Sequence, residues 1–110
     1  MSWIALCRAD ELAPGQMRAF PVPGLAIPVL LIHLADGRLI ACASICPHED
    51  VSLEGGDLDG AQITCPGHGY EFDLETGRCR HDRSLELRRY QARRAGDWIE
   101  VRIDLLRPLG

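Results

Sequence analysis

Two short cysteine–histidine pairs constrain this chain more than any other feature. Cys46-Pro47-His48 is followed, after sixteen intervening residues, by Cys65-Pro66-Gly67-His68. Two thiolates and two imidazoles form a ligand set that selects zinc or an iron–sulfur cluster over magnesium or calcium. The four side chains at these positions, Cys46, His48, Cys65 and His68, are therefore the candidate metal ligands.

The order of the ligands separates the two kinds of metal site. A zinc finger usually groups its cysteines on one turn and its histidines on another. Here each loop supplies one of each, so two loops facing each other across a two-metal centre would place both cysteines on one metal and both histidines on the other. A structural zinc module with one tetrahedral ion stays open as an alternative.

In this ligand pattern, and in the run CPGHGYEFDLETG over Cys65–Gly77, the chain resembles the Rieske-type ferredoxins of bacterial aromatic-ring oxygenase systems. The resemblance implies one [2Fe–2S] cluster per chain, in which two histidines replace two cysteines on one iron. It places Cys46 and Cys65 on the iron that stays ferric. It places His48 and His68 on the iron that accepts the electron, at an exposed tip where partner proteins dock.

Residues near the ligands indicate which branch of that family the chain resembles. The high-potential Rieske proteins of respiratory cytochrome bc complexes have a further cysteine in each loop, joined as a disulfide, and a serine and a tyrosine that bond the cluster. In this chain the two cysteine positions are Val51 and Gly67, and the serine and tyrosine positions are Tyr70 and Phe72. With fewer donors to the reduced cluster, we expect a potential at the low end, roughly −150 mV.

Strand signals dominate the rest of the sequence. Asp36-Gly37 is typical of a tight hairpin turn, and alternating apolar and polar residues predict half-buried strands. The strands that we expect are Met17–Val22, Ile27–Ala35, Arg38–Ala43, Leu85–Ala92 and Trp98–Ile103, with one short helical turn over Asp10–Leu12. The fold class is therefore all-β, an antiparallel β sandwich.

The middle of the chain, Ser44–Arg80, is rich in Gly, Pro, Asp and Glu. Such a segment buries little apolar surface and needs a metal to organise it. Gln62–Thr64 and Tyr70–Asp73 are expected to pair as small strands. We therefore expect a single Rieske domain over residues 1–110, with a cluster-binding subdomain inserted at about 44–80.

The remaining cysteines and histidines have structural interpretations. Five cysteines are an odd number, and the N-terminus lacks the features of a secretory signal. We therefore expect a cytoplasmic protein in which Cys7, Cys42 and Cys79 are reduced and buried. His33 and His81 are expected to be structural or solvated rather than ligands.

Charge is unevenly distributed along a chain of net charge −4 in which every basic residue is Arg. Eight acidic residues and no basic one lie between Glu49 and Glu75. They indicate either a solvated surface or an acidic collar that steers a basic redox partner. The Arg-rich stretch over 78–94 is interrupted by acids and has no aromatic platform, so nucleic acid is not expected as a partner. No apolar run approaches the ~18 residues of a membrane span.

The resemblance implies an electron carrier rather than an enzyme. It would pass single electrons from a flavoprotein reductase to a terminal oxygenase, with both partners docking transiently near His48 and His68. A Rieske oxygenase needs a further, larger domain for its substrate iron, and this chain has no room for it. A small Rieske subunit of a nitrite-reductase-like complex remains the alternative, and a monomer is expected.

Overall fold

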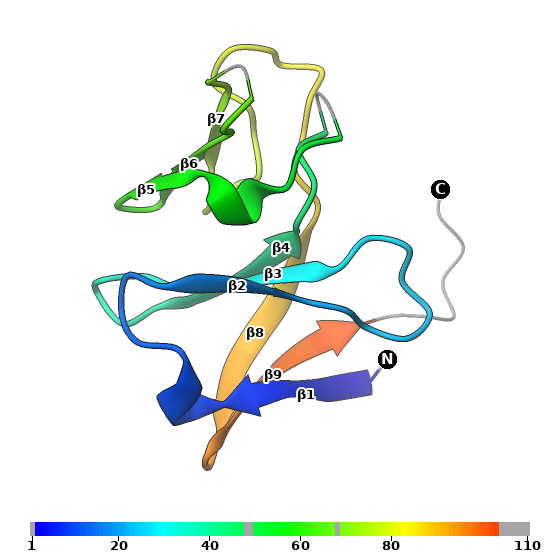
Figure 1. Ribbon diagram of the computed structural model, residues 1–110, viewed down its shortest axis with the longest axis vertical. Coiled ribbons are helices and arrows are strands. Elements are labelled where there is room, and N and C mark those ends of the chain that lie inside the picture. The colour runs from blue at the N-terminus through cyan, green and yellow to red at the C-terminus, as the bar shows by residue number, and fades with distance from the viewer. Residues whose placement is uncertain (1, 48–49, 68, 104–110) are drawn as a thin grey trace.

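The computed structural model describes residues 2–47, 50–67 and 69–103. In this part of the chain six strands form one antiparallel sheet in the order β1-β9-β8-β4-β3-β2, and three form a smaller sheet in the order β5-β6-β7 (Figure 1). The strands of the larger sheet are β1 (Ser2–Arg8), β2 (Met17–Phe20), β3 (Val29–His33), β4 (Leu39–Ala43), β8 (Arg89–Ala95) and β9 (Trp98–Ile103). Those of the smaller sheet are β5 (Asp57–Asp59), β6 (Gln62–Thr64) and β7 (Glu71–Asp73).

The larger sheet folds over on itself because β8 changes partners along its length. It pairs with β4 at Tyr90 and Arg89 and then with β9 from Gln91 to Ala95. The β2-β3-β4 layer therefore faces the β1-β9-β8 layer, which confirms the predicted antiparallel sandwich. Alternate side chains from the two layers fill the space between them, among them Val29, Leu31, Ala41, Ile99 and Val101.

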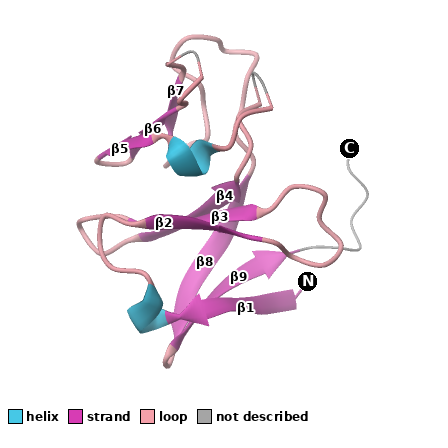
Figure 2. Ribbon diagram, in the orientation of Figure 1, coloured by secondary structure: helices cyan, strands magenta, loops and turns pink. Residues whose placement is uncertain are grey.

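A second core joins the smaller sheet to the other face of β3 and β4. Leu30, Ile32 and Cys42 point to this face, as their alternation with the first core requires. They lie in one buried cluster with Ile63 and Phe72 of the smaller sheet. Figure 2 shows the smaller sheet and its loops on one side of the larger sheet, together with one of the two short 3₁₀ helices. These helices are η1 (Ala9–Glu11) and η2 (Leu53–Gly55).

The predicted elements are largely confirmed, and their ends are corrected. Asp36-Gly37 forms the turn between β3 and β4, with Gly37 at φ +97°, and β9 has the predicted bounds. The last strand but one is shorter at its start than predicted, because residues 85–88 lie outside β8. Among the strands of the described residues, β1 and β5 were not predicted. None of the helical segments among the described residues has the length and apolar character needed to cross a bilayer.

Glu54 connects η2, which follows the first ligand loop, to the free edge of β2. Its Oε2 accepts a hydrogen bond from the Ala19 amide at 2.7 Å, so a backbone donor of an edge strand is bonded by a side chain of η2. We expect Glu54→Ala to lower the free energy of unfolding by about 1 kcal/mol. The Ala19 amide should then exchange its hydrogen faster in NMR or mass spectrometry.

Glu54→Gln is the matched control, because it removes the charge and keeps an acceptor oxygen. It should leave the Ala19 amide largely protected. Unchanged exchange of the Ala19 amide in Glu54→Ala would contradict this role.

Candidate metal centre

The second ligand loop is the connection between β6 and β7. Cys65 directly follows β6, and its amide donates to the Tyr70 carbonyl oxygen at 2.7 Å. The Gly69 amide donates to the Cys65 carbonyl oxygen at 3.1 Å, and Gly69 has φ +74°. A side chain other than glycine would be strained in this left-handed conformation. The two hydrogen bonds of Cys65, with Tyr70 and with Gly69, thus close a narrow hairpin loop.

The first ligand loop is closed in a similar way. Ile45 and Ser52 form an isolated antiparallel bridge, and the Cys46 amide donates to the Val51 carbonyl oxygen at 2.9 Å. The Leu53 amide, at the start of η2, donates to the Ser44 carbonyl oxygen at 2.7 Å. Cys46 therefore lies at the neck of a short loop that leaves β4 and enters η2.

The two candidate cysteine ligands are both buried in the second core. Cys46 is 2% exposed and Cys65 is 1% exposed, and both belong to the cluster that contains Phe72. All five cysteines of the chain are described, and none forms a disulfide. Two buried cysteines at the necks of two loops fit the sulfur-ligated end of a [2Fe–2S] cluster.

The two candidate histidine ligands, His48 and His68, lie outside the described residues. Among the residues that are described, no three His, Cys, Asp or Glu side chains converge on a point where they could hold a metal. The other two histidines have local partners. Nδ1 of His33 is 2.8 Å from the Leu12 carbonyl oxygen, and Nε2 of His81 is 3.1 Å from Oε1 of Glu71.

A polar network next to the second ligand loop was not predicted from the sequence. The rings of Tyr70 and His81 lie with their centroids 5.8 Å apart. Glu71 contacts His81 through one carboxylate oxygen and the Gln62 amide through the other. Arg80 Nη1 in turn donates to Oε1 of Gln62 at 2.7 Å. The network depends on the antiparallel pairing of Phe72 with Cys79 and of Glu71 with Arg80, for which the sequence has no local signal.

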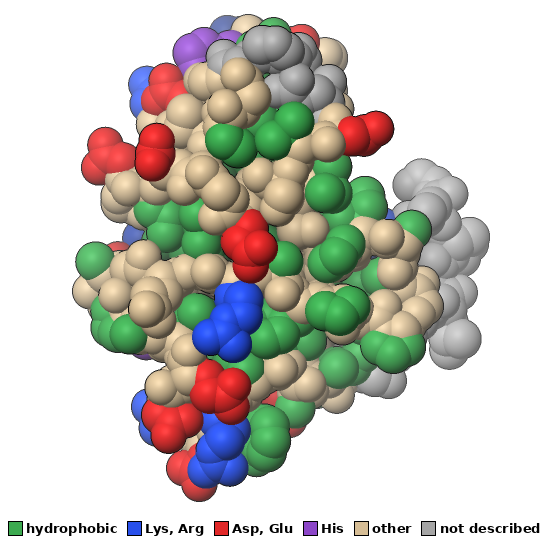
Figure 3. Space-filling view, viewed as in Figure 1, with side chains coloured by type: hydrophobic (Ala, Val, Ile, Leu, Met, Phe, Trp, Pro, Cys, Tyr) green, Lys and Arg blue, Asp and Glu red, His purple; other side chains and the backbone are tan. Residues whose placement is uncertain are grey.

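The surface around the acidic residues between Glu49 and Glu75 also carries basic side chains, so its charge is less uniform than the sequence alone indicates. Arg38, from the turn between β3 and β4, donates to Oε1 of Glu75 at 2.6 Å and to Oδ2 of Asp36 at 2.9 Å. Asp50, Asp57 and Asp59 are exposed, and Glu49 lies outside the described residues. Figure 3 shows carboxylates around the end of the molecule that carries the smaller sheet, with a cationic and an imidazole side chain among them.

Cys42 is the most deeply buried of the cysteines without an expected metal role. Burial raises its pKa to about 12 from an ordinary value of 9.0, and the charge of Arg89 acts in the opposite direction. The folded chain therefore keeps a proton that the unfolded chain releases, so this thiol contributes stability that is lost as the pH rises from 9.0 towards 12.

We expect the Cys42 thiol to resist iodoacetamide at pH 8 in the folded protein, since only about one molecule in 10⁴ carries the thiolate there. Peptide mass spectrometry after alkylation measures this, with the same protein in guanidinium chloride as the control. Native alkylation of Cys42 at the denatured rate would contradict the expectation.

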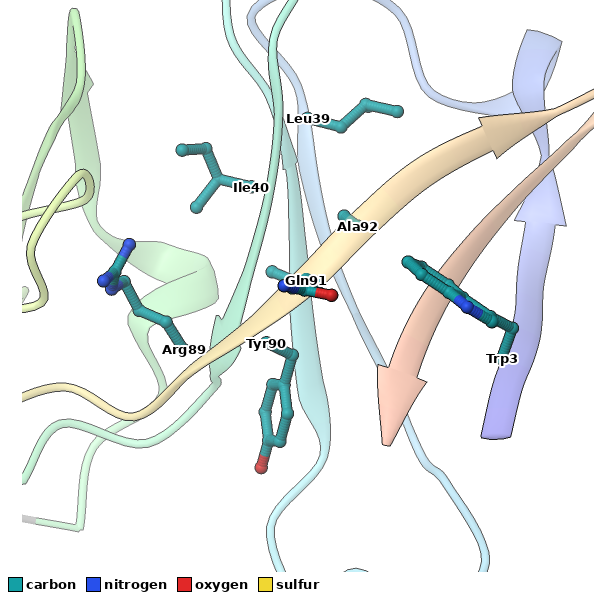
Figure 4. Close-up of a pocket in the computed structure, with 8 residues that line it drawn as sticks. Trp3, Leu39, Ile40, Arg89, Tyr90, Gln91 and Ala92 are labelled. Atoms are coloured by element: carbon teal, nitrogen blue, oxygen red, sulfur yellow. The ribbon is translucent and has the colours of Figure 1, made fainter. Parts of the chain in front are cut away.

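A shallow hollow of about 350 Å³ lies elsewhere, where β8 separates from β4. Trp3, Leu39, Gln91 and Ala92 contribute to its walls. In Figure 4 Arg89 and Ile40 extend on the side away from Trp3. None of its lining residues belongs to the segment 44–80, so the hollow is separate from the candidate metal centre.

Comparisons with known proteins point to one domain family. The model of the Rieske [2Fe-2S] domain matches residues 2–91. The chain is 35% identical over 75 residues to the ferredoxin component of the p-cumate 2,3-dioxygenase system of Pseudomonas putida, covering 67% of this chain and 62% of that protein. It is 38% identical over 79 residues to the ferredoxin component of the alkene monooxygenase system of Xanthobacter autotrophicus, covering 70% of this chain and 62% of that protein.

The fold also matches a chain in the solved complex of reduced oxygenase and oxidized ferredoxin of carbazole 1,9a-dioxygenase. The TM-score is 0.81 and the identity 29%, with 90% of this chain and 91% of that chain covered. The sequence matches therefore span about three fifths of the length of the two ferredoxin components, whereas the structural match extends over nearly all of both chains.

Proposed function

Because the chain belongs to the Rieske [2Fe-2S] domain family, we propose that it is a one-electron carrier, the ferredoxin component of an oxygenase system. The observation that carries the proposal is the burial of Cys46 and Cys65 at the necks of two short loops. The ferredoxin components that the chain matches support it.

In this proposal, Cys46 and Cys65 bind one iron, and His48 and His68 bind the other. When bound, the cluster takes up and gives away one electron at a time. The protein contributes burial of the two thiolates among Leu53, Phe72 and other apolar side chains, which keeps water from the sulfur end. The narrow hairpin around Gly69 holds the second loop in shape. Imidazole ligands place less negative charge on their iron than thiolates do, which raises its potential.

The side chains near the ligands support a potential at the low end of the Rieske range. Phe72 is fully buried and has no donor. Tyr70 is half-buried and its ring packs beside His81. We expect roughly −150 mV in cyclic voltammetry.

The partners in this proposal are a flavoprotein reductase, which supplies the electron, and a terminal oxygenase, which receives it near His48 and His68. The related ferredoxin of carbazole 1,9a-dioxygenase has been solved in complex with its oxygenase. The chain itself catalyses no reaction. We further propose one Rieske domain over residues 1–110 with a cluster-binding subdomain at about 44–80, acting as a monomer in the cytoplasm.

A visible spectrum, a metal analysis and one transfer reaction test the proposal. The anaerobically purified protein should be red-brown, contain two irons and two acid-labile sulfides per chain, and bleach with dithionite. The reduced protein should then reoxidise when mixed with the oxygenase component of carbazole 1,9a-dioxygenase or of a similar system. A colourless protein with one zinc ion would overturn the proposal. If the protein bound the cluster but transferred no electron to any oxygenase component, the family assignment would stand and the proposed oxygenase partner would be refuted.

A further inference from the structure

A third segment, residues 78–84, runs beside the second ligand loop. Cys79 bridges Phe72, and the Arg80 amide donates to the Glu71 carbonyl oxygen at 2.8 Å. The segment therefore follows the outer edge of β7 in the antiparallel direction. It places His81 against the ring of Tyr70, the residue whose carbonyl oxygen accepts the Cys65 amide.

This segment is held in shape by its own hydrogen bonds. Oδ1 of Asp82 accepts from the Ser84 amide at 2.9 Å and from the Ser84 hydroxyl at 2.6 Å. The Leu85 amide donates to the Asp82 carbonyl oxygen at 3.1 Å, and the Arg80 side chain is bonded to Gln62. A partner that binds here would lose little entropy in ordering the loop.

The segment carries positive charge at the edge of the smaller sheet opposite to β5. Arg80 and Arg83 are exposed. At the other edge, Asp57 of β5 is exposed and pairs with Thr64, the residue before Cys65. The sheet order β5-β6-β7 with residues 78–80 outside β7 puts the backbones of Asp57 and of the segment 78–84 at opposite edges of the smaller sheet, while the Arg80 side chain reaches back to Gln62 of β6. With strands about 4.8 Å apart, these two edges lie on the order of 14 Å from each other.

We propose that Arg83 forms the cationic half of a two-signed docking surface, which binds carboxylates of the redox partner while Asp57 faces the partner's cationic side chains. This inference rests on the proposed electron-transfer function and specifies the partner's surface. A rim of one sign attracts a partner in any rotation about the metal centre, whereas opposite charges on its two sides favour one rotation. The partner is thus a protein with acidic and basic groups on opposite sides of its own electron entry or exit point.

Arg83→Gln and Asp57→Asn test the proposal, each with a matched control. Asp59→Asn changes the same strand at the end remote from Cys65, where Asp59 pairs with Gln62. Arg94→Gln removes an exposed arginine of β8 in the larger sheet. Reoxidation of each reduced, cluster-loaded variant is followed by stopped-flow absorption with the oxygenase component of carbazole 1,9a-dioxygenase. We expect Arg83→Gln and Asp57→Asn to raise the half-saturating concentration about three- to tenfold at low salt, with the limiting rate kept.

Small ions of opposite charge provide a second measurement that needs no protein partner. Arg83→Gln should slow oxidation by ferricyanide and speed oxidation by tris(phenanthroline)cobalt(III), and Asp57→Asn should do the reverse. Both controls should leave all these rates unchanged. Normal transfer by the wild type together with unchanged transfer by Arg83→Gln would overturn the docking inference alone. A cluster-loaded wild type that reduces no oxygenase component would refute the proposed function instead.

Discussion

Replacing Cys65 by alanine is expected to abolish the visible absorption of the protein and to reduce its bound iron to nearly zero. The Cys65 thiol is almost completely buried, and its backbone closes the β6–β7 hairpin. A bound cofactor stabilises the folded state alone, so a cluster held at 1,000 times its dissociation constant contributes about 4 kcal/mol. We therefore expect the free energy of unfolding to fall by about that amount. Iron and sulfide assays, EPR after dithionite and a thermal melt measure these losses.

Cys79→Ala is the matched control for this substitution. Cys79 is 5% exposed and lies in the same core cluster as Cys65, so the two variants remove the same atoms from similar surroundings. The control should keep two irons and lose about 1 kcal/mol of stability. If the Cys65→Ala protein still contained two irons and two sulfides, Cys65 would not be a ligand. Equal loss of iron in both variants would assign the effect to packing.

The sequence predicts the fold best where clean alternation or a tight-turn signal marks a strand. Trp98–Ile103 alternates cleanly and has the predicted bounds, and Asp36-Gly37 specifies the turn between β3 and β4. Strand β1 escaped prediction because its partner, β9, lies at the other end of the chain. Leu87 alternates like a strand residue, but its side chain is buried in the second core from a loop. Its apolar character reflects the core it covers rather than the strand that begins at Arg89.

In the candidate centre, too, the sequence predicts features that are local in the chain and misses contacts between distant residues. The spacing of the four candidate ligands indicates the metal chemistry, because each pair lies within one short loop. The contacts that surround the centre join residues distant in sequence, such as Arg38 with Glu75 and Glu54 with Ala19. No local pattern predicts such pairs. The run of acidic residues over 49–75 was therefore visible in the sequence, whereas the contacts of Glu75 with Arg38 and of Glu71 with His81 required the fold.

Gly56→Ala is expected to have the other large effect, on a residue that binds no metal. A Cβ at Gly56 would lie 2.2 Å from the Thr64 carbonyl oxygen and 3.1 Å from that of Leu53. Both are backbone atoms and cannot turn away as a flexible side chain could. Gly56 has φ −80°, which suits any residue, so lack of space is the cause. Since Thr64 precedes Cys65, the added methyl group must displace η2 or the strand that leads into the second ligand loop.

We expect Gly56→Ala to cost about 3 kcal/mol of stability, near the upper end for overpacking, and to lower the iron content or shift the EPR g-values. Gly55→Ala adds the same methyl group one residue earlier, where nothing lies within 4 Å of the new Cβ. This control should bind the cluster normally and gain about 0.5 kcal/mol, because alanine restricts the unfolded chain. If the two variants had equal stability and equal spectra, η2 and the end of β6 would not be in close contact. This contact would then not determine the position of Cys65.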